Sequence, residues 1–496
     1  MVLSKSKYLM GLQCPKLLWM SYHAKDQFPE TDPQTQAIFD QGNDVTALAR
    51  TLFPGGIEIE GFEDYEAILK KTQELLPKLK PLFEAAFSYK NTFARPDILT
   101  PNKDGSWDLH EVKSSTQPKD VHYHDLAFQK YCYEGAGLKI RRSHLILINN
   151  QYVKQGKIDP NELFSRQDVS GEVNALAAGV EKNIDVMLKN LQQKNCPEIK
   201  IGPYCNDPYP CDLQDMCWSF LPDENIFILN RIRKEKAFEL LAKKVLSIAD
   251  LPDNVPLTPS QEIQRECHRT KKCFINKSAI KGFLDQLELP SYFLDFETVN
   301  PAIPFYDQSR PYQNIPFQFS LHILSDWDKK PQHHGFLAGG TEDPRSELLE
   351  ILKDLLGDQG SIVSYNMNFE LTRLRECVET FPEYRGWFKK IEKRFLDLIV
   401  PFRSFDYYDP KQMGRTSIKK VFPALTGGSY DGMEIAEGGI ASIEFARAIF
   451  GKGISVKDKA KVLKNLEAYC KLDTQAMIDI LKVLKAKTEN GAVKKC

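Results

Sequence analysis

The sequence lacks any long uninterrupted run of apolar residues. Its longest runs, such as 145–148, have the length of one β-strand, whereas a helix that crosses a bilayer needs about 20 consecutive apolar residues. The first residues include Lys5 and Lys7 but no apolar stretch followed by small residues, so the pattern of a secretory signal peptide is also missing. We therefore expect a cytoplasmic protein that has no association with membranes.

An excess of charge of either sign is also missing. The 66 lysines and arginines are balanced by 67 aspartates and glutamates, and the formal net charge is -1. This balance argues neither for nor against a nucleic-acid partner, because binding requires only a local basic face. No internal repeat or low-complexity segment occurs, and a chain of 496 residues normally folds into two or three domains.

Cysteine occurs in an odd number, 11, which argues against a disulfide framework in a chain that we expect to be cytoplasmic. Cys132, Cys377 and Cys470 lie in helical or apolar patterns that are typical of small core residues. Four others are set apart by their spacing, one near the start of the chain and three clustered about two hundred residues later: Cys14, Cys205, Cys211 and Cys217.

Hydrophobic periodicity predicts a mixture of helices and strands up to residue 222. The turn pair Asp104-Gly105 lies between two strand-like segments and indicates a β-hairpin. The predicted elements are helices at 34–52 and 64–86, hairpin strands at 92–99 and 107–112, a helix at 121–135, a strand at 144–148 and a helix at 161–193.

The rest of the chain predicts a connector and a second α/β domain. Residues 225–285 are polar and helical, with prolines as breakers. An acidic strand near 292–298 follows, and then a strand at 317–324, a helix at 345–356, a strand at 361–365 and further helices. We predict domains at 1–222 and 287–496, joined by a helical connector at 223–286.

The predicted hairpin carries two carboxylates and a lysine. Glu111 and Lys113 are two residues apart and share one face of a strand, and pairing of the strands can bring Asp97 beside them. Two carboxylates can hold a metal ion, and a lysine can orient a water molecule or stabilise charge on a phosphate. A cross-strand ion pair on the surface is the alternative interpretation.

These residues resemble a known family. Arg-Pro-Asp-Ile-Leu at 95–99 and Leu-His-Glu-Val-Lys-Ser-Ser at 109–115 resemble the PD-(D/E)XK core of RecB-like nucleases, which have a restriction-endonuclease-like fold. Gln129 and Tyr133 match the family's Q-xxx-Y element, which helps to place DNA near the metal. The family often has a histidine ligand in an earlier helix. The corresponding helix here has none, although Asp44 could substitute, and Glu84 is a further acid whose role is open.

The four spaced cysteines resemble the iron–sulfur staple of RecB-like exonucleases, including the CRISPR-associated branch. The resemblance implies that Cys14, Cys205, Cys211 and Cys217 hold a 4Fe-4S cluster, which would clamp the two ends of the nuclease domain together. Five residues separate Cys205 from Cys211 and Cys211 from Cys217, which departs from the usual spacing, so a Cys₄ zinc site is the alternative.

The acidic strand predicts a second site. Asp295 and Glu297 alternate with apolar residues and point to the same face, an arrangement that suits a hard divalent ion such as Mg²⁺ or Mn²⁺. Two acids on a solvated edge strand are the alternative. Further along, Asn366 is a candidate helix N-cap with Glu370 in the first turn, and Tyr469 and Asp473 share a helix face.

This ordered set resembles the DEDD exonucleases of the RNase H-like fold, in the branch that uses tyrosine. The resemblance implies that four carboxylates hold two metal ions and that Tyr469 orients the attacking water. The implied metal ligands are Asp295, Glu297, Glu370 and Asp473. Glu370 stands where the family usually has aspartate, and Asp397 is expected to have a secondary role at most.

Segments 417–425, 429–430 and 438–442, together with the acidic strand, resemble an uncharacterised bacterial domain that is often fused behind RecB-like nucleases. Lys419 and Lys420 are candidate phosphate contacts or a solvated helix end. Aromatic residues near the acidic strand could stack on bases, although core packing is the safer interpretation for Phe296; the candidates are Phe296, Tyr312 and Phe317.

The sequence thus predicts an α/β nuclease with a RecB-like domain, an iron–sulfur staple, a helical connector and an RNase H-like exonuclease domain. The expected reaction is Mg²⁺- or Mn²⁺-dependent hydrolysis of phosphodiester bonds, most readily in single-stranded DNA or at DNA ends. Two alternatives stay open. One is a nucleic-acid-binding scaffold with one or both centres inactive, and the other is an exonuclease that acts on RNA or short oligonucleotides.

Overall fold

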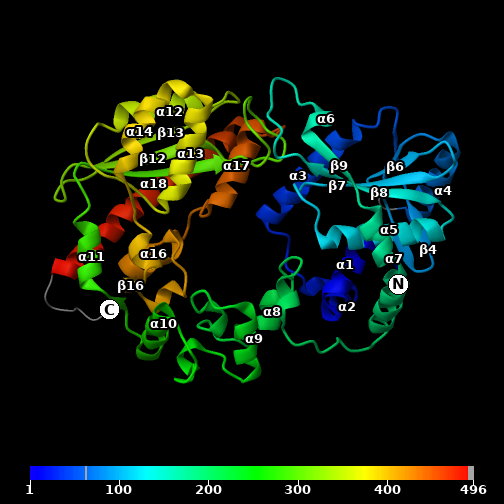
Figure 1. Ribbon diagram of the computed structural model, residues 1–496, viewed down its shortest axis with the longest axis horizontal. Helices are drawn as coiled ribbons and strands as arrows, with labels where there is room; N and C mark the ends of the chain where they lie inside the picture. The colour runs from blue at the N-terminus through cyan, green and yellow to red at the C-terminus, as the bar shows by residue number, and fades with distance from the viewer. Residues whose placement is uncertain (62–63, 490–496) are drawn as a thin grey trace. The chain divides into compact units, whose positions relative to one another are not determined.

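A computed structural model describes residues 1–61 and 64–489 and divides the chain into two compact units (Figure 1). The N-terminal unit consists of Met1–Ser219 and Pro301–Tyr312, and the C-terminal unit consists of Phe220–Asn300 and the described chain from Gln313 onward. The segment that we predicted as a connector therefore belongs to the C-terminal unit. Both units mix helices with sheets, as expected of an α/β chain.

The N-terminal unit is built on a six-stranded sheet with the order β2-β3-β6-β7-β8-β9. Strands β6 and β7 form the predicted antiparallel hairpin, and α5 (Asp120–Gly135) carries the chain from β7 to the parallel strand β8. A separate three-stranded sheet has the order β1-β5-β4. The strands of the larger sheet are β2 (Ile57–Glu58), β3 (Leu82–Phe83), β6 (Ile98–Pro101), β7 (Trp107–Lys113), β8 (Ile140–Ile148) and β9 (Phe164–Asp168).

Three predicted elements of this unit were wrong in extent. The helix expected at 64–86 ends as α4 (Tyr65–Leu75), because Pro77 and Pro81 interrupt it and the apolar residues that follow form β3. The helix expected at 161–193 is divided by β9, which pairs with β8 before α7 (Ser170–Leu191) begins. The strand expected at 92–99 is divided between β5 (Thr92–Ala94) and β6, which lie in different sheets.

Different elements pack on the two faces of the larger sheet. Leu109, Leu145 and Leu147 pack against α5 and α7, together with α1 (Lys5–Gln13) and α2 (Pro15–His23). Ile146, Ile148 and their neighbours face α3 (Pro33–Arg50) and the segment Pro301–Tyr312. The sheet is therefore covered on both faces, and the side chains that point toward α5 from β7 are buried except at its end, where Lys113 is partly exposed.

Segment Pro301–Tyr312 is tied to the N-terminal unit although it lies between two strands of the C-terminal unit in the sequence. Its Ala302 N–H donates to Gln41 Oε1 at 2.8 Å, and its Tyr312 hydroxyl donates to the Ser114 carbonyl at 2.6 Å. Lys154 forms an ion pair with Asp307. No periodicity in the sequence indicated this exchange of a segment.

The C-terminal unit is built on a five-stranded sheet with the order β13-β12-β11-β14-β15. Strands β13, β12 and β11 are antiparallel neighbours, whereas β11, β14 and β15 run parallel. The predicted strands at 317–324 and 361–365 and the predicted helix at 345–356 are all present. The strands are β11 (Ser291–Val299), β12 (Ile315–Leu324), β13 (Gln332–Leu337), β14 (Ile362–Ser364) and β15 (Phe395–Asp397).

Helices cover both faces of this sheet (Figure 1). Tyr292, Leu294 and Phe296 of β11 pack toward α12 (Arg345–Leu355), α13 (Met367–Thr380) and α14 (Arg385–Ile391). The alternate residues of β11 face the long helix α18 (Val456–Glu489) and α17 (Gly438–Phe450). Strand alternation thus directs the two acids of β11 away from the apolar core and toward α18.

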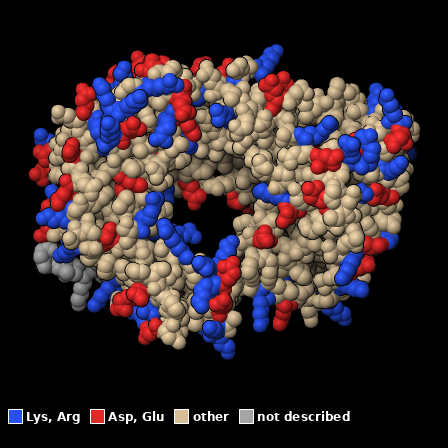
Figure 2. Space-filling model, in the orientation of Figure 1, with Lys and Arg blue, Asp and Glu red and all other residues tan. Residues whose placement is uncertain are grey.

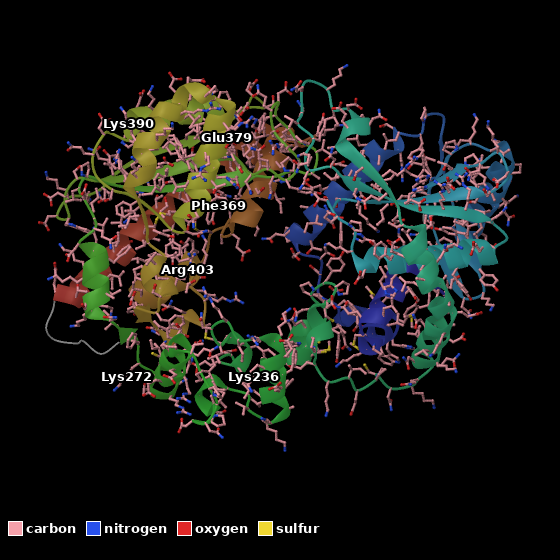
Figure 3. All side chains as sticks on the ribbon, viewed as in Figure 1. Lys236, Lys272, Phe369, Glu379, Lys390 and Arg403 are labelled. Atoms are coloured by element: carbon pink, nitrogen blue, oxygen red, sulfur yellow. The ribbon has the colours of Figure 1, made fainter. Side chains whose placement is uncertain are left out.

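Charged side chains of both signs occur on the visible face of each unit, and lysine and arginine side chains gather at the upper left of the view, on the C-terminal unit (Figure 2). Lysines also occur in the predicted connector, where Lys236 lies on α9 (Lys234–Ala242) and Lys272 follows α10 (Pro259–Thr270) (Figure 3).

Within the described residues, no helix has both the length and the apolar character required to traverse a membrane.

A buried histidine in the N-terminal unit makes stability dependent on pH. His110 is 1% exposed. It packs between the rings of Phe53 and His144, and its Nε2 lies 2.9 Å from Thr100 Oγ1. Burial, followed by the neighbouring His144, lowers the pKa of His110 to about 3, compared with about 6.5 in an unfolded chain.

As the pH falls below 6.5, His110 takes up a proton in the unfolded chain before it does so in the folded protein. The free energy of unfolding should therefore be highest above pH 6.5 and should decrease as the pH falls toward 3. Relative to His110→Gln, the unmodified protein should lose on the order of 1 kcal/mol of unfolding free energy per pH unit in this range. Urea unfolding at several pH values measures this slope. The exposed His23 supplies a control, since His23→Gln should keep the slope of the unmodified protein.

Candidate functional site

The predicted hairpin brings its carboxylates and lysine together in the N-terminal unit. Asp97 immediately precedes β6, and its Oδ2 accepts a 2.7 Å hydrogen bond from the Val112 N–H. Glu111 is 1% exposed. Its Oε1 accepts from Lys113 Nζ at 2.8 Å and from Lys5 Nζ at 2.7 Å. Two ammonium groups therefore meet one carboxylate oxygen in a buried position.

Helix α5 contributes three more side chains at helical spacing. Gln129 donates from Nε2 to Glu111 Oε2 at 2.8 Å and to Asp125 Oδ1 at 2.9 Å, and Tyr133 donates to Gln129 Oε1 at 2.7 Å. The second oxygen of Asp125 accepts from Lys113 Nζ at 2.7 Å. This network joins four of the five residues predicted for the site, and the fifth, Asp97, is held beside them by the Val112 N–H. Because Glu111 is buried, the cross-strand surface pair is the wrong interpretation.

Two members of this network were missed. Asp125 is one turn before Gln129 on the same face of α5, so the i, i+4 rule gave a usable signal. Lys5 opens α1 about one hundred residues away in the sequence, and nothing local connects it with Glu111. Of the two earlier acids, Asp44 is exposed on α3, whereas Glu84 is paired with Arg50 and Arg95 and is close enough for the charges of Lys5 and Glu111 to act on it.

The charges of this site are unevenly compensated. Burial, together with the charge of Glu111, raises the pKa of Asp97 to about 7. Burial also opposes ionisation of Glu111, but the ammonium groups of Lys113 and Lys5 outweigh it and hold the pKa of Glu111 well below its usual value. Asp97 is thus the carboxylate that would gain most from a nearby cation, because its only hydrogen-bond donor described here is a backbone N–H.

The four spaced cysteines line one small cavity in the N-terminal unit. Cys14 ends α1 and precedes α2, and Cys205 lies in a short 3₁₀ turn. The Cys211 N–H donates to the Cys205 carbonyl at 2.9 Å, and Cys217 lies in α8 (Gln214–Trp218). Apolar and polar residues complete the walls: Leu17, Ile199, Ile201 and Leu213, with Lys16, Lys200, Tyr204 and Gln214. The sequence thus identified four thiols that the fold collects from both ends of the unit.

The spacing of these sulfurs bears on what they can hold. Among residues 1–61 and 64–489, no three of the four sulfurs lie within 4.8 Å of one another. Sulfurs on one tetrahedral zinc ion are about 3.8 Å apart, because each Zn–S bond is about 2.3 Å. Burial raises the pKa of Cys14 and raises that of Cys211 to about 11. Without a metal the thiols of Cys14 and Cys211 therefore stay protonated, and the four sulfurs are not gathered as closely as the ligands of one zinc ion.

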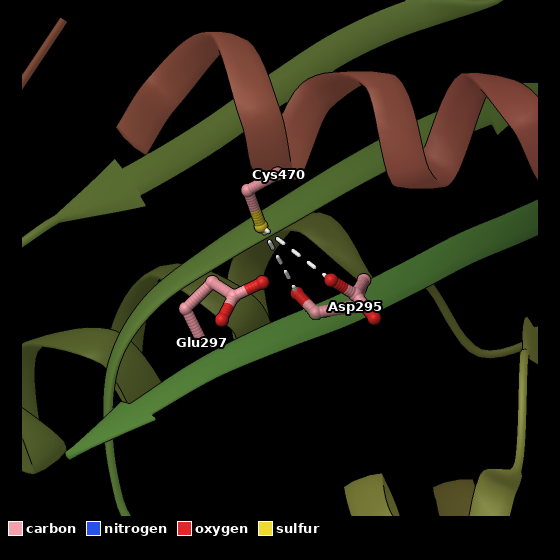
Figure 4. A group of neighbouring side chains, drawn as sticks. All are labelled: Asp295, Glu297 and Cys470. Carbon is pink, nitrogen blue, oxygen red and sulfur yellow. Dashed lines mark hydrogen bonds between the residues drawn. The ribbon is translucent and has the colours of Figure 1, made fainter. Parts of the chain in front are cut away.

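A second cluster lies in the C-terminal unit, where β11 meets α18. Ligand atoms of Asp295, Glu297 and Cys470 lie within 4.8 Å of one another (Figure 4). The Cys470 sulfur is 3.7 Å from Asp295 Oδ2. Glu297 and Cys470 are buried, whereas Asp295 is partly accessible. Cys470 was predicted only as a core residue, and the structure adds a sulfur donor to the predicted pair of acids.

Glu370 in the first turn of α13 is the third carboxylate. It is 2% exposed, and its Oε2 has no hydrogen-bond partner in the described chain. Asn366 does stand at the N-cap, but its φ is 76° and its side chain makes no capping bond. The Asn366 N–H instead donates to Asp397 Oδ1 at 2.8 Å. Asp397 thus positions the turn before Glu370, which agrees with a secondary role.

The fourth carboxylate, Asp473 on α18, is held by a lysine and a tyrosine. Lys419 Nζ lies 3.0 Å and 3.4 Å from the two oxygens of Asp473. The Tyr430 hydroxyl donates to Asp473 Oδ1 at 2.6 Å. Tyr469, one turn before Asp473, has its ring centroid 4.0 Å from Lys419 Nζ. Lys419 was predicted as a phosphate contact or a solvated helix end, and its place beside Asp473 could not be read from the sequence.

Mutual repulsion dominates the electrostatics of this cluster. Burial and the charge of Asp473 raise the pKa of Asp295 to about 8. Burial and the charge of Asp295 raise the pKa of Glu297 and of Glu370. Burial followed by the neighbouring carboxylates also raises the pKa of the Tyr469 hydroxyl, which therefore remains a proton donor. A divalent cation would reverse the shifts of the three acids, since it favours their charged forms.

The aromatic residues predicted to stack on bases are not available for it. Phe296 and Phe317 are buried, with Phe317 stacked on Phe445 at 3.7 Å, and Tyr312 belongs to the N-terminal unit. Two accessible side chains near Glu370 were missed: the partly exposed Phe369 on α13, and the exposed Arg403, which ends α15 (Val400–Arg403) (Figure 3). Arg403 donates to the Asn366 side-chain oxygen at 3.3 Å.

Comparison with known proteins gives similarity without an assigned activity. Residues 292–417, which include β11 and Glu370, match a family described as a domain of unknown function, DUF2779. The chain is 28% identical over 229 residues to the "Uncharacterized protein MG366 homolog" of Mycoplasma pneumoniae, with 42% of this chain and 34% of that protein covered. It is 25% identical over 234 residues to "Uncharacterized protein MG366" of Mycoplasma genitalium, with coverages of 44% and 35%.

A third relative, "Uncharacterized protein UU173" of Ureaplasma parvum, is 24% identical over 248 residues, with 46% of this chain and 36% of that protein covered. The chain thus matches only about a third of the length of these curated relatives. A solved structure described as "Crystal structure of SSO0001" has a TM-score of 0.22 and 12% identity, over 45% of this chain and 87% of that chain. A score this low carries no argument about the fold.

Proposed function

We propose that the protein is a metal-dependent nuclease with two catalytic centres, one in each unit. The observation that carries the proposal is a set of four acids from three separate elements, Asp295, Glu297, Glu370 and Asp473, whose burial and charges raise the pKa values of the first three. In the described chain, Lys419 is the one cation paired with any of them. Uncompensated acids are costly to bury. A protein retains such a cluster when a bound cation compensates it.

In the N-terminal centre, Asp97 and Glu111 would hold a divalent ion, Mg²⁺ or Mn²⁺. Such an ion lowers the pKa of bound water and stabilises charge on the leaving oxygen. Lys113 is fixed by Glu111 and Asp125 at 2.8 Å and 2.7 Å, so its ammonium group is pre-oriented to stabilise the phosphate. Gln129 and Tyr133 hold the Glu111 carboxylate in place through their chain of hydrogen bonds.

In the C-terminal centre, Asp295, Glu297 and Glu370 would bind the metal. Tyr469 keeps its proton and lies beside the acids, where its hydroxyl is suited to orient an attacking water. Burial raises the pKa of the Cys470 thiol well above its usual value, so this thiol stays protonated and donates to Asp295 instead of binding the metal. The proposed reaction is hydrolysis of phosphodiester bonds from a strand end, as in the tyrosine branch of the DEDD exonucleases.

The four cysteines would hold a 4Fe-4S cluster with a structural role. Their number and their shared cavity support a four-thiolate metal site, and the resemblance to RecB-like nucleases favours the cluster over a single zinc ion. No catalytic step needs the cluster. Its part is to connect Cys14 with the segment of Cys205, Cys211 and Cys217, and thereby to fix α1, which carries Lys5 into the first centre.

Single-stranded DNA is the proposed substrate. Arg403 supplies an exposed cation for the phosphate backbone, and Phe369 supplies a partly exposed ring for a base next to Glu370. Neither side chain distinguishes DNA from RNA, so the assay must include both. A scaffold that binds a strand without cleaving it is the rival function.

The test is an anaerobic assay of end-labelled DNA and RNA strands with Mg²⁺ or Mn²⁺. Substitution of Lys113 by alanine should lower cleavage by the N-terminal centre about 10²- to 10³-fold, since one preorganised charge is removed. It should leave cleavage by the C-terminal centre unchanged. Lys119 begins α5 in the same unit, and Lys119→Ala provides the control. Binding of labelled strands with no cleavage by the unmodified protein would favour the scaffold instead.

A further inference from the structure

Lys419 is held as a cation on three sides. It lies in the first turn of α16 (Ile418–Thr426), and its ammonium group spans both oxygens of Asp473 at 3.0 Å and 3.4 Å. The same nitrogen is 3.6 Å from the ring centroid of Tyr430 and 4.0 Å from that of Tyr469. A cation between two aromatic faces is attracted to the negative face of each ring. This is a built position for one positive charge.

Both oxygens of the Asp473 carboxylate therefore already have partners. Lys419 reaches both of its oxygens, and the Tyr430 hydroxyl donates to Oδ1 at 2.6 Å. The other three acids of the centre lack such partners. In the part of the chain that the structure describes, no lysine or arginine forms an ion pair with Asp295, Glu297 or Glu370, and Glu370 Oε2 accepts no hydrogen bond.

The centre therefore has two unequal halves, and this inference rests on the proposed function. We propose that it binds one divalent ion, at Asp295, Glu297 and Glu370, and that the Lys419 ammonium group replaces a second ion beside Asp473. The two-ion arrangement implied by the family resemblance would require that ion to displace Lys419. It would have to break a bidentate ion pair and leave an ammonium group close to a divalent charge.

Charge neutrality agrees with this division. Four ionised acids carry four negative charges, of which one divalent ion and Lys419 together neutralise three. One negative charge then remains, whereas a single divalent ion without the lysine would leave two. The lysine therefore reduces the uncompensated charge of a one-ion centre. Removal of the lysine charge should therefore create a vacancy for a second cation at Asp473.

The experiment counts Mn²⁺ ions per chain by equilibrium dialysis and metal analysis, and records electron paramagnetic resonance spectra. Lys419→Met should bind one more Mn²⁺ than the unmodified protein and should show the spectrum of a spin-coupled ion pair. Lys419→Arg keeps the charge and should bind the same number as the unmodified protein. Sites elsewhere in the chain contribute equally to all three proteins and cancel in the differences.

A spin-coupled pair in the unmodified protein, or no additional ion in Lys419→Met, would overturn the inference. Lys419→Gln is the second variant in case the methionine variant fails to fold, and it should also gain one ion. Asp295→Asn separates this inference from the proposed function, because it should lose one ion. Equal counts for Asp295→Asn and the unmodified protein would reject the metal centre itself. A loss there without a gain in Lys419→Met would reject only the role of the lysine.

Discussion

Asparagine in place of Asp295 should abolish cleavage by the C-terminal centre and should at the same time stabilise the metal-free protein. Asparagine has nearly the same shape but carries no charge, so the metal loses a central ligand while β11 keeps its packing. We expect cleavage to fall by at least about a thousandfold, which corresponds to about 4 kcal/mol of transition-state free energy. The readout is the product ladder from an end-labelled single strand.

The substitution should raise the stability of the metal-free protein although it abolishes cleavage, because it removes one of several carboxylates that repel one another. The pKa of Asp295 is raised to about 8 in the folded protein, compared with about 3.9 in an unfolded chain. The stabilisation from its bound proton is complete below pH 3.9 and is lost as the pH rises through 8. Metal-free protein should therefore melt at a lower temperature at pH 8 than at pH 5, and Asp295→Asn should reduce that difference.

A matched control is the exposed Asp328, which lies in the loop after β12. Asp328→Asn should keep both the activity and the pH dependence of melting. Addition of Mn²⁺ should raise the melting temperature of the unmodified protein more than that of Asp295→Asn, since binding to the folded state adds its own free energy. With the N-terminal centre disabled by Lys113→Ala, full cleavage after the further change Asp295→Asn would show that the acidic strand is not a catalytic centre.

The parts of both sites that the sequence predicted correctly depend on local periodicity. Asp295 and Glu297 share a face because strand side chains alternate, and Gln129 and Tyr133 share a face because they are four residues apart on α5. The turn at Asp104-Gly105 fixed the hairpin that carries Glu111 toward Asp97. Within each of these elements the relevant distances are a few residues, and the backbone geometry alone sets them.

The parts that were missed depend on long-range packing. Lys5 reaches Glu111 across about one hundred residues of sequence, and Lys419 reaches Asp473 across more than fifty. Neither lysine has a neighbour pattern that distinguishes it from a solvated one. Strand β9 was mistaken for helix because its five residues lie within a longer stretch of helical periodicity, and only its pairing with β8 decides its conformation.

The replacement of Cys205 by serine is expected to have the second large effect, on the stability of the N-terminal unit. Serine is a poor ligand for iron, so the cluster should be lost along with its link between Cys14 and the last cysteines. Metal binding contributes directly to folding in such sites, by up to on the order of 10 kcal/mol. We expect the variant to lose its brown colour and iron, and the melting transition of this unit to fall by more than 10 °C.

Cys196 is the matched control for this substitution. It packs in the same cluster of side chains as Cys14, Cys211 and Cys217, but it does not line their cavity. Cys196→Ser should keep iron content, colour and melting temperature, because its thiol is a neighbour of the site and not a ligand. Equal loss of iron from both variants would mean that the ligand set is wrong. Zinc without iron in the unmodified protein would retain the four-cysteine site but replace the cluster by a single ion.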